Sequence, residues 1–446
     1  MLGITYGRKQ KMSLRAGTGQ MDVTPRFGTP MAGYWYLRRM SGVLDPLYLK
    51  AVVLEEGGSM AAIVTADVCY FPASWIEDAV ALIEERTGIS RDGIFVTASH
   101  THTGPVTERM IPGLTAPPEY QAFFNQRLAD VVEQARQQLE PVRAAVGESS
   151  VPGIAFNRRL LGADGKVTTY KPDETRSAEE LRPAGPVDDT ARVLQLVKES
   201  SGEPTALLVN FALHPDTISG TLASADFPGV MSRTLSGMTE GEPEVLFLNG
   251  PAGDINHLNP TNPGNVYEAD NARRIGQILA AGAYRATREP VWIEGENLRT
   301  GRLEVELAVR NADEASLQTA RSTVSEHSGE LTKEVSRAQD LLKTAERAGE
   351  SFTTEVSGIA IGNLALLGLP GEIFAALGLE ARNGSPFDHT LIAELTNDYA
   401  GYIMPEEGFE QGGYETLLRP GSFAEASAGS KLTSAGSRLL AKLRNA

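Results

Sequence analysis

Residues 94–105 of this sequence read IFVTASHTHTGP. The stretch begins as a strand, because aromatic and β-branched residues occupy consecutive positions from Ile94. Apolar residues without alternation are typical of a strand that is buried on both faces. The pattern then turns polar, and His100 and His102 stand two positions apart just after the apolar run. The stretch therefore predicts a buried strand with a His-x-His pair at its carboxyl end.

Apolar runs of the same kind recur along the chain and alternate with helical patterns. Strands are expected at residues 51–54, 61–65, 94–98, 206–212, 245–248, 364–368 and 391–395. Helices are expected at residues 74–87, 118–139, 269–287 and 373–382. This interleaving predicts an α/β fold of layered mixed sheets flanked by helices. Residues 311–350 contain little Gly or Pro, which predicts a helical insert made of one long helix or a helical hairpin.

Composition excludes several classes of protein. The chain has 446 residues, and 41 Lys and Arg against 57 Asp and Glu give a net charge of −16. Such a balance argues against a nucleic-acid partner, which requires a basic face. Cys69 is the one cysteine, so an intrachain disulfide and a Cys-based zinc cluster are both excluded. No apolar run has the length of a membrane span, so no transmembrane segment is expected.

The chain is expected to form one domain after a short tail. Residues 1–15 are polar and basic and predict a flexible N-terminal tail, and residues 16–446 then form the domain. No apolar segment follows the basic residues near the N-terminus, so a secretory signal is not predicted. A cytoplasmic location is therefore the default expectation, and secretion would require a signal upstream of Met1.

Several predicted strands end in turns that combine Gly or Pro with residues suited to catalysis. These turns contain His100 and His102, His214, Asp254 with His257, Glu372, and Tyr402. Ligands of α/β sheets bind beyond the carboxyl ends of strands. Neutral imidazole is the commonest metal ligand, and residues two apart in an extended segment point to the same side. Together the turns indicate a metal site assembled from several strand ends.

Each of these residues taken alone also has a purely structural interpretation. A single histidine in a turn can be a hydrogen-bonded structural residue. Glu372 lies where a helix could begin, and Asp254 could cap a turn. Tyr402 and Tyr414 could be packing residues.

A set of short motifs resembles the catalytic domain of the neutral/alkaline, non-lysosomal ceramidase family. The motifs are AGTGQMDVTP (16–25), ASHTHTGP (98–105), NR (157–158), FALHP (211–215), NGPAGD (249–254), LPGE (369–372) and NDYAGY (397–402). The resemblance runs from residue 16 to about residue 418. It implies a ceramidase-like catalytic domain for this chain. The family also carries a C-terminal immunoglobulin-like domain, which is expected to be absent here.

The resemblance also implies a site and an activity. Its zinc ligands would be His100, His214, Glu372 and Tyr402. His102 would lie beside the metal or be catalytic, and Tyr414 would line the site. In the mechanism expected from these residues, His102, Asp254 and Tyr414 are the catalytic residues, with His102 the first candidate for proton transfer and Asp254 orienting a neighbour. Arg158 would lie near the substrate, and Asn256 stands where the family has a serine that contacts the substrate. Zn²⁺ is therefore the expected cofactor.

The resulting hypothesis is a zinc-dependent amidohydrolase that cleaves an amide (N-acyl) bond with a metal-activated water. Its partner would be a small-molecule substrate that is N-acylated or lipid-like. Two alternatives stay open. The same scaffold could act on esters, lactones or carbohydrate-derived substrates, or the chain could be a non-catalytic metal- or ligand-binding protein.

Overall fold

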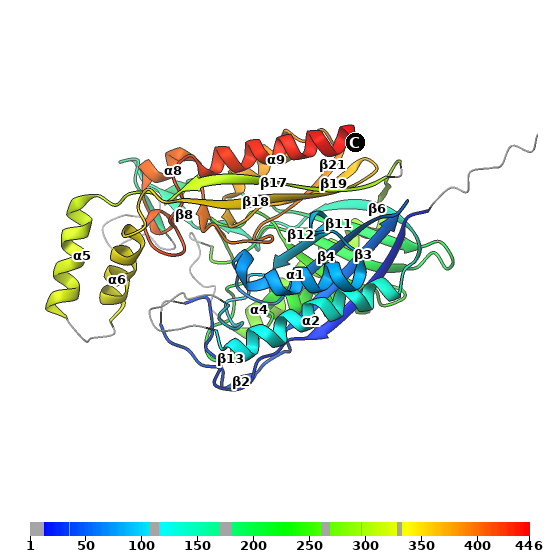
Figure 1. The fold of residues 1–446 in the computed structure, drawn as a ribbon, viewed down its shortest axis with the longest axis horizontal. Coiled ribbons are helices and arrows are strands. Elements are labelled where there is room, and N and C mark those ends of the chain that lie inside the picture. The colour runs from blue at the N-terminus through cyan, green and yellow to red at the C-terminus, as the bar shows by residue number, and fades with distance from the viewer. Residues whose placement is uncertain are drawn as a thin grey trace, which may run out of the picture.

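The computed structural model describes residues 13–34, 36–107, 116–169, 181–259, 268–295, 297–327 and 332–446. Two mixed sheets face each other, and helices cover their outer faces (Figure 1). This arrangement confirms the predicted α/β fold of layered sheets flanked by helices. No helix in the described ranges combines the length and the apolar character that crossing a membrane requires.

The larger sheet has nine strands, eight of which follow the order β14-β12-β11-β6-β1-β3-β4-β5. Their bounds are β1 (Arg15–Asp22), β3 (Tyr48–Glu56), β4 (Ser59–Ala66), β5 (Ile94–Ala98), β6 (Glu140–Ser150), β11 (Thr190–Lys198), β12 (Pro204–Phe211) and β14 (Glu244–Asn249), and β16 (Val291–Trp292) pairs with β6. The pairs β4–β5 and β12–β14 are parallel. Strands β12 and β14 therefore end on one side, and β4 and β5 end together. Five antiparallel pairings separate β12 from β4, so β5 runs opposite to β12 along the sheet.

The smaller sheet has four strands in the order β17-β18-β19-β21. Their bounds are β17 (Leu298–Ala308), β18 (Ser351–Ile361), β19 (Leu364–Gly368) and β21 (His389–Ala393). Short paired segments in the connections are β2 (Gly42–Val43), β7 (Phe156–Asn157), β8 (Arg159–Leu161), β9 (Val167–Thr169), β10 (Arg182–Pro183), β13 (Leu222–Ala223), β15 (Ile255–Asn256), β20 (Glu372–Ile373) and β22 (Tyr402–Ile403). The pair β19–β21 is parallel, so these two strands also end on one side.

Apolar side chains fill the space between successive layers. The two sheets enclose a core that includes Val52, Leu196, Ile359 and Leu366. Helices α1 (Ala73–Thr87), α2 (Pro118–Gln137), α3 (Asp226–Met238) and α4 (Ala269–Arg288) pack on the larger sheet. Helices α7 (Ala375–Asn383) and α9 (Ala428–Asn445) pack on the smaller one, and α8 (Glu406–Gln411) follows β22. Burial on both faces explains the continuous apolar runs of the central strands.

The insert predicted at residues 311–350 forms two helices, α5 (Glu314–Glu326) and α6 (Lys333–Ala345). They pack against each other and project from one end of the layers (Figure 1). Each helix begins at a side-chain cap, because Asp313 accepts a hydrogen bond from the Ser316 N–H and Thr332 accepts one from the Val335 N–H. Of the alternatives left open by the sequence, the two-helix form is observed.

Some predicted boundaries differ from the structure. The strand expected at residues 391–395 ends at Ala393, and the helix expected at 373–382 begins at Ala375. Glu372 and Ile373 instead form β20, which pairs in parallel with Tyr402 and Ile403. At the N-terminus, β1 begins at Arg15, and residues 1–12 of the predicted tail lie outside the described residues.

Candidate active site

The carboxyl ends of strands from both sheets converge on one region. His100 and His102 follow β5, His214 follows β12, and Glu372 lies just after β19. Contacts between the strand-end segments fix this meeting point, because the Asn397 N–H donates to the Val96 carbonyl at 2.8 Å. The β20–β22 pairing places Glu372 directly opposite Tyr402. The structure therefore brings together the four residues that the family resemblance implies as metal ligands.

Three of these side chains direct donor atoms at one another. Nε2 of His100 lies 3.0 Å from Nε2 of His214 and 3.4 Å from Oε2 of Glu372. Nε2 of His214 lies 3.3 Å from the same carboxylate oxygen. All three side chains are buried. Together they form a group of donor atoms that can hold a metal ion.

The hydrogen-bond partner of Nδ1 determines which nitrogen of each neutral imidazole carries the proton. Nδ1 of His100 lies 2.7 Å from the Cys69 carbonyl, and Nδ1 of His214 lies 3.0 Å from the Ala252 carbonyl. A carbonyl oxygen only accepts hydrogen bonds, so both Nδ1 atoms carry the proton and both Nε2 atoms of the neutral rings present lone pairs. Nη1 of Arg158 lies 3.4 Å from Nε2 of His214. A cation between the two Nε2 atoms and the carboxylate oxygen would offset the repulsion that remains among them. The chemistry of this donor set therefore fits a metal ion.

His100 reaches this position through an unusual backbone conformation. Its φ is 72°, in the left-handed region that few residues other than glycine adopt. Such conformations cost roughly 1–3 kcal/mol and concentrate at functional sites. Here the turn ends β5 and directs the imidazole into the donor group, which is a functional reason for the strain.

His102 lies beside the donor group. Its Nε2 lies 3.4 Å from Nε2 of His100, and its Nδ1 lies 3.4 Å from Oδ1 of Asp216. Tyr34 donates a hydrogen bond to the same carboxylate oxygen. Burial alone would raise the pKa of Asp216, but His102 and Tyr34 outweigh it and hold that pKa below its usual value. Burial lowers the pKa of His102. These shifts favour a neutral imidazole next to an ionised Asp216.

A second buried network holds Tyr402. Nη2 of Arg158 donates to the Tyr402 hydroxyl at 3.1 Å and to the Gly253 carbonyl at 2.8 Å. Its Nε donates to Glu415 at 2.9 Å, and Arg159 binds the other oxygen of Glu415 at 2.7 Å. Arg158 is only 1% exposed and is not among the described residues that line the cavity discussed next. In this structure Arg158 orients Tyr402.

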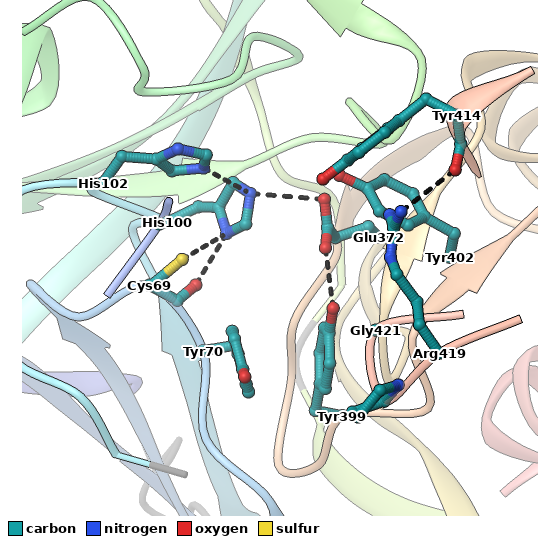
Figure 2. A pocket seen from close by; sticks show the side chains of 12 residues that line it. Cys69, Tyr70, His100, His102, Glu372, Tyr399, Tyr402, Tyr414, Arg419 and Gly421 are labelled. Carbon is teal, nitrogen blue, oxygen red and sulfur yellow. Dashed lines mark hydrogen bonds and ion pairs between the residues drawn. The ribbon is translucent and has the colours of Figure 1, made fainter. Parts of the chain in front are cut away.

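A small cavity of about 30 Å³ lies against the donor group. Its described lining residues are Gly33, Cys69, Tyr70, His100, His102, Glu372, Tyr399, Tyr402, Tyr414, Arg419, Pro420 and Gly421, most of which Figure 2 labels. The Tyr399 hydroxyl donates to Oε1 of Glu372 at 2.8 Å, which leaves Oε2 facing the two histidines. The rings of Tyr402 and Tyr414 meet edge to face with centroids 6.0 Å apart. Hydroxyl and cationic groups thus form much of this wall.

Two residues expected at the site have other surroundings. Asp254 accepts hydrogen bonds from Asn157 at 2.6 Å and from the Ala375 N–H at 2.8 Å, and burial raises its pKa to about 6. Asn256 lies in β15, is fully buried, and accepts a hydrogen bond from the Leu258 N–H at 3.0 Å. Neither residue is among the described residues that line the cavity. Through these two hydrogen bonds Asp254 holds β7 against the start of α7.

Sequence reasoning missed three residues of this region. Tyr399 lies inside the motif NDYAGY, and Asp216 directly follows the motif FALHP, so their residue types offered a weak signal. Arg419 lies in the segment LLRPGS, where no motif was recognised. The side chain of Arg419 is nonetheless buried and faces the cavity.

Comparison with solved structures shows the same fold. The neutral ceramidase from Pseudomonas aeruginosa matches with a TM-score of 0.75 at 19% identity, over 97% of this chain and 75% of that chain. A ceramidase complexed with C2 also matches with a TM-score of 0.75, at 18% identity, over 97% of this chain and 76% of that one. At these identities the likeness establishes the architecture of the chain.

Sequence comparison identifies the family. Neutral ceramidase A from Dictyostelium discoideum is 24% identical over 233 residues, which are 49% of this chain and 31% of that protein. The matched region thus spans about a third of the length of this relative. The family model "Neutral/alkaline non-lysosomal ceramidase, N-terminal" matches residues 14–265, more than half of the chain. The chain therefore belongs to the neutral/alkaline non-lysosomal ceramidase family.

Proposed function

We propose that this protein is a zinc-dependent hydrolase that cleaves an amide (N-acyl) bond. The observation that carries the proposal is the convergence of His100 Nε2, His214 Nε2 and Glu372 Oε2 at separations of 3.0–3.4 Å. Relatives that match this chain are named neutral ceramidases, which makes an N-acylated, lipid-like compound the first substrate class to test.

The donor set favours zinc among the common metal ions. Two imidazole nitrogens and one carboxylate oxygen are typical of a catalytic zinc site, which keeps a further position open. Ligands about 2.0–2.1 Å from a tetrahedral zinc lie about 3.3 Å from one another. The three separations in this structure are close to that value. Tyr402, opposite Glu372 in the β20–β22 pair, is the proposed fourth protein ligand, so that the attacking water would take a fifth position.

The surrounding residues suit hydrolysis of an acyl bond. Zinc bound at this site would lower the pKa of a coordinated water to about 7 and polarise the substrate carbonyl. His102 lies next to His100 and is held by Asp216, so it is placed to take the proton of the attacking water and return it to the leaving amine. Tyr414 lines the cavity and can donate to the oxyanion, a contribution typically worth about 2.7–4 kcal/mol.

Metal analysis tests the proposal first. Purified protein supplied with zinc is expected to contain about one zinc per chain by inductively coupled plasma mass spectrometry, and His100→Ala is expected to lose it. His327, at the exposed end of α5, gives a matched control, so His327→Ala is expected to retain zinc. Hydrolysis of N-acyl compounds is then measured for each variant. A metal-free His100→Ala protein that keeps full activity would overturn the zinc mechanism.

A further inference from the structure

Glu394 is a buried carboxyl group that the proposed mechanism does not use. It directly follows β21, and its side chain is 0% exposed. It is not among the described residues that line the cavity, and it does not belong to the donor group of His100, His214 and Glu372. A buried carboxyl group is costly unless hydrogen bonds compensate it. The partners of Glu394 therefore show what this group holds in place.

Three hydrogen-bond donors converge on the carboxyl group of Glu394. Oε2 accepts hydrogen bonds from the Ala252 N–H at 3.1 Å and from the Ile373 N–H at 2.8 Å. Oε1 accepts one from Nδ2 of Asn249 at 3.0 Å. Asn249 is the last residue of β14 in the larger sheet, whereas Ile373 lies in β20, which follows β19 of the smaller sheet. One carboxyl group thus joins chain segments that extend from both sheets.

Each of the two backbone donors adjoins a proposed metal ligand. The Ala252 carbonyl lies 3.0 Å from Nδ1 of His214 and orients that ring. Ile373 directly follows Glu372 in the chain. Oε2 of Glu394 therefore holds the residue whose carbonyl orients one ligand against the backbone that carries the other ligand.

We propose that Glu394 is a positioning residue of the metal site, which sets the separation between His214 and Glu372 and thereby strengthens zinc binding. This inference rests on the proposed function, and it concerns a group that does not touch the metal. His214 follows a strand of the larger sheet and Glu372 follows one of the smaller sheet, so the 3.3 Å between their donor atoms depends on contacts between the two sheets. Ligands that are held at this separation before the metal arrives lose less freedom on binding.

The zinc affinity of two Glu394 variants tests the inference. Glu394→Met keeps a similar volume without an acceptor, and its Kd for zinc is expected to rise about 10- to 100-fold, as for other groups that hold metal ligands in place. The Gly253 N–H donates to the Ile373 carbonyl at 2.9 Å and keeps the two segments together in each variant. Glu394→Gln offers an amide oxygen to the Ala252 and Ile373 N–H groups, so it should retain most of the affinity. Competition with a chelating dye at fixed pH measures the Kd without any substrate, and an unchanged Kd in Glu394→Met would overturn the inference.

Glu56 gives a matched control for the loss of a buried carboxyl group. It is 6% exposed, and its Oε2 accepts a hydrogen bond from the Asn297 N–H at 2.7 Å. Glu56 pairs with Ser59 at the start of β4, and His100 follows β5, which runs parallel to β4, so the length of a strand separates the two residues. Glu56→Met is therefore expected to destabilise the fold and to leave the Kd for zinc unchanged. An equal rise of the Kd in Glu56→Met would indicate a general effect of destabilisation and would also overturn the inference.

Thermal unfolding keeps the test decisive if Glu394→Met is too unstable for titration. A ligand stabilises a folded protein more when it binds more tightly, so one zinc concentration should raise the Tm of Glu394→Met less than that of the wild type or of Glu56→Met. Glu394→Asp withdraws the carboxyl group by one methylene and should show the same deficit. Equal zinc-induced shifts in all four proteins would overturn the inference and leave the amidase proposal intact. A wild type that binds no zinc would instead refute the zinc site itself, and with it both proposals.

Discussion

Oδ1 of Asp216 lies 3.4 Å from Nδ1 of His102, and the same oxygen accepts a hydrogen bond from the Tyr34 hydroxyl. All of these contacts involve residues from separate turns at one edge of the layers. The arrangement fixes the imidazole of His102 with its Nε2 toward His100, at 3.4 Å. Asp216 therefore acts on the proposed proton transfer through the orientation of His102.

Asp216→Asn should separate catalysis from metal binding. Removing the charge that orients His102 is expected to lower kcat about 10- to 100-fold, as for other groups that orient active-site imidazoles. Zinc content should not change, because Asp216 does not belong to the donor group. Tyr34→Phe removes only the hydroxyl and should have a smaller effect in the same direction. Loss of zinc from Asp216→Asn, to the extent seen in His100→Ala, would contradict this assignment.

Gly33→Ala should displace His102 without touching the metal ligands. Gly33 has a φ of 98°, and a Cβ atom built on it would lie 2.6 Å from Cβ of His102. Gly28 has a similar φ of 85° with nothing within 4 Å of its Cβ position, so Gly28→Ala is a matched control. Both substitutions are expected to cost about 1–2 kcal/mol of stability from the backbone. A loss of kcat is expected in Gly33→Ala alone, and equal activities of the two variants would refute the steric argument.

The parts of the fold that were predictable from sequence are those with continuous apolar runs. Strands β5 and β19 were predicted to the residue, and β3, β4, β12 and β14 were located, because burial on both faces makes their composition unambiguous. Strand β17 was missed because several of its outward positions are polar, as expected at the edge of a sheet. Helix α9 was missed although one face of it packs on the smaller sheet.

Of the candidate site, the sequence pattern predicted only the residues that stand at the ends of apolar strands. His100, His102 and His214 stand in turns just after buried strands, which is what the sequence pattern revealed. Their convergence is a property of the folded chain, because β5 and β12 run in opposite directions along the sheet. Tyr402 depended on the family resemblance, because the β20–β22 pairing that places it opposite Glu372 is two residues long and has no sequence pattern. Arg419 depends on a turn closed by Ser422 and braced by Arg310, contacts that only the folded chain brings together.

Glu415→Gln should destabilise the fold severely. Its carboxylate binds Nε of Arg158 at 2.9 Å and Nη1 of Arg159 at 2.7 Å, and all three side chains are almost fully buried. Removing one partner of a buried ion pair costs about 3–5 kcal/mol, because it leaves a buried charge uncompensated. Glu148 also binds an arginine, Arg192, but its side chain is 52% exposed, so Glu148→Gln should cost about 0–1 kcal/mol. Urea unfolding of the two variants measures the difference, and similar costs would contradict the argument.

Asp188 should contribute a pH-dependent part of the stability. Burial alone would raise the pKa of Asp188, but Arg382 and Arg192, at 2.5 Å and 2.9 Å, outweigh it and lower that pKa. Above the unfolded pKa of about 3.9 the carboxylate stabilises the fold fully, and this contribution is lost as the pH falls through the lower folded pKa. The free energy of unfolding of Asp188→Asn should therefore lie below that of the wild type at pH 7, and the gap should narrow below about pH 4. Asp270 is 81% exposed, so the free energy of unfolding of Asp270→Asn should equal that of the wild type at every pH. A difference between Asp188→Asn and the wild type that stays constant down to pH 3 would contradict the lowered pKa of Asp188.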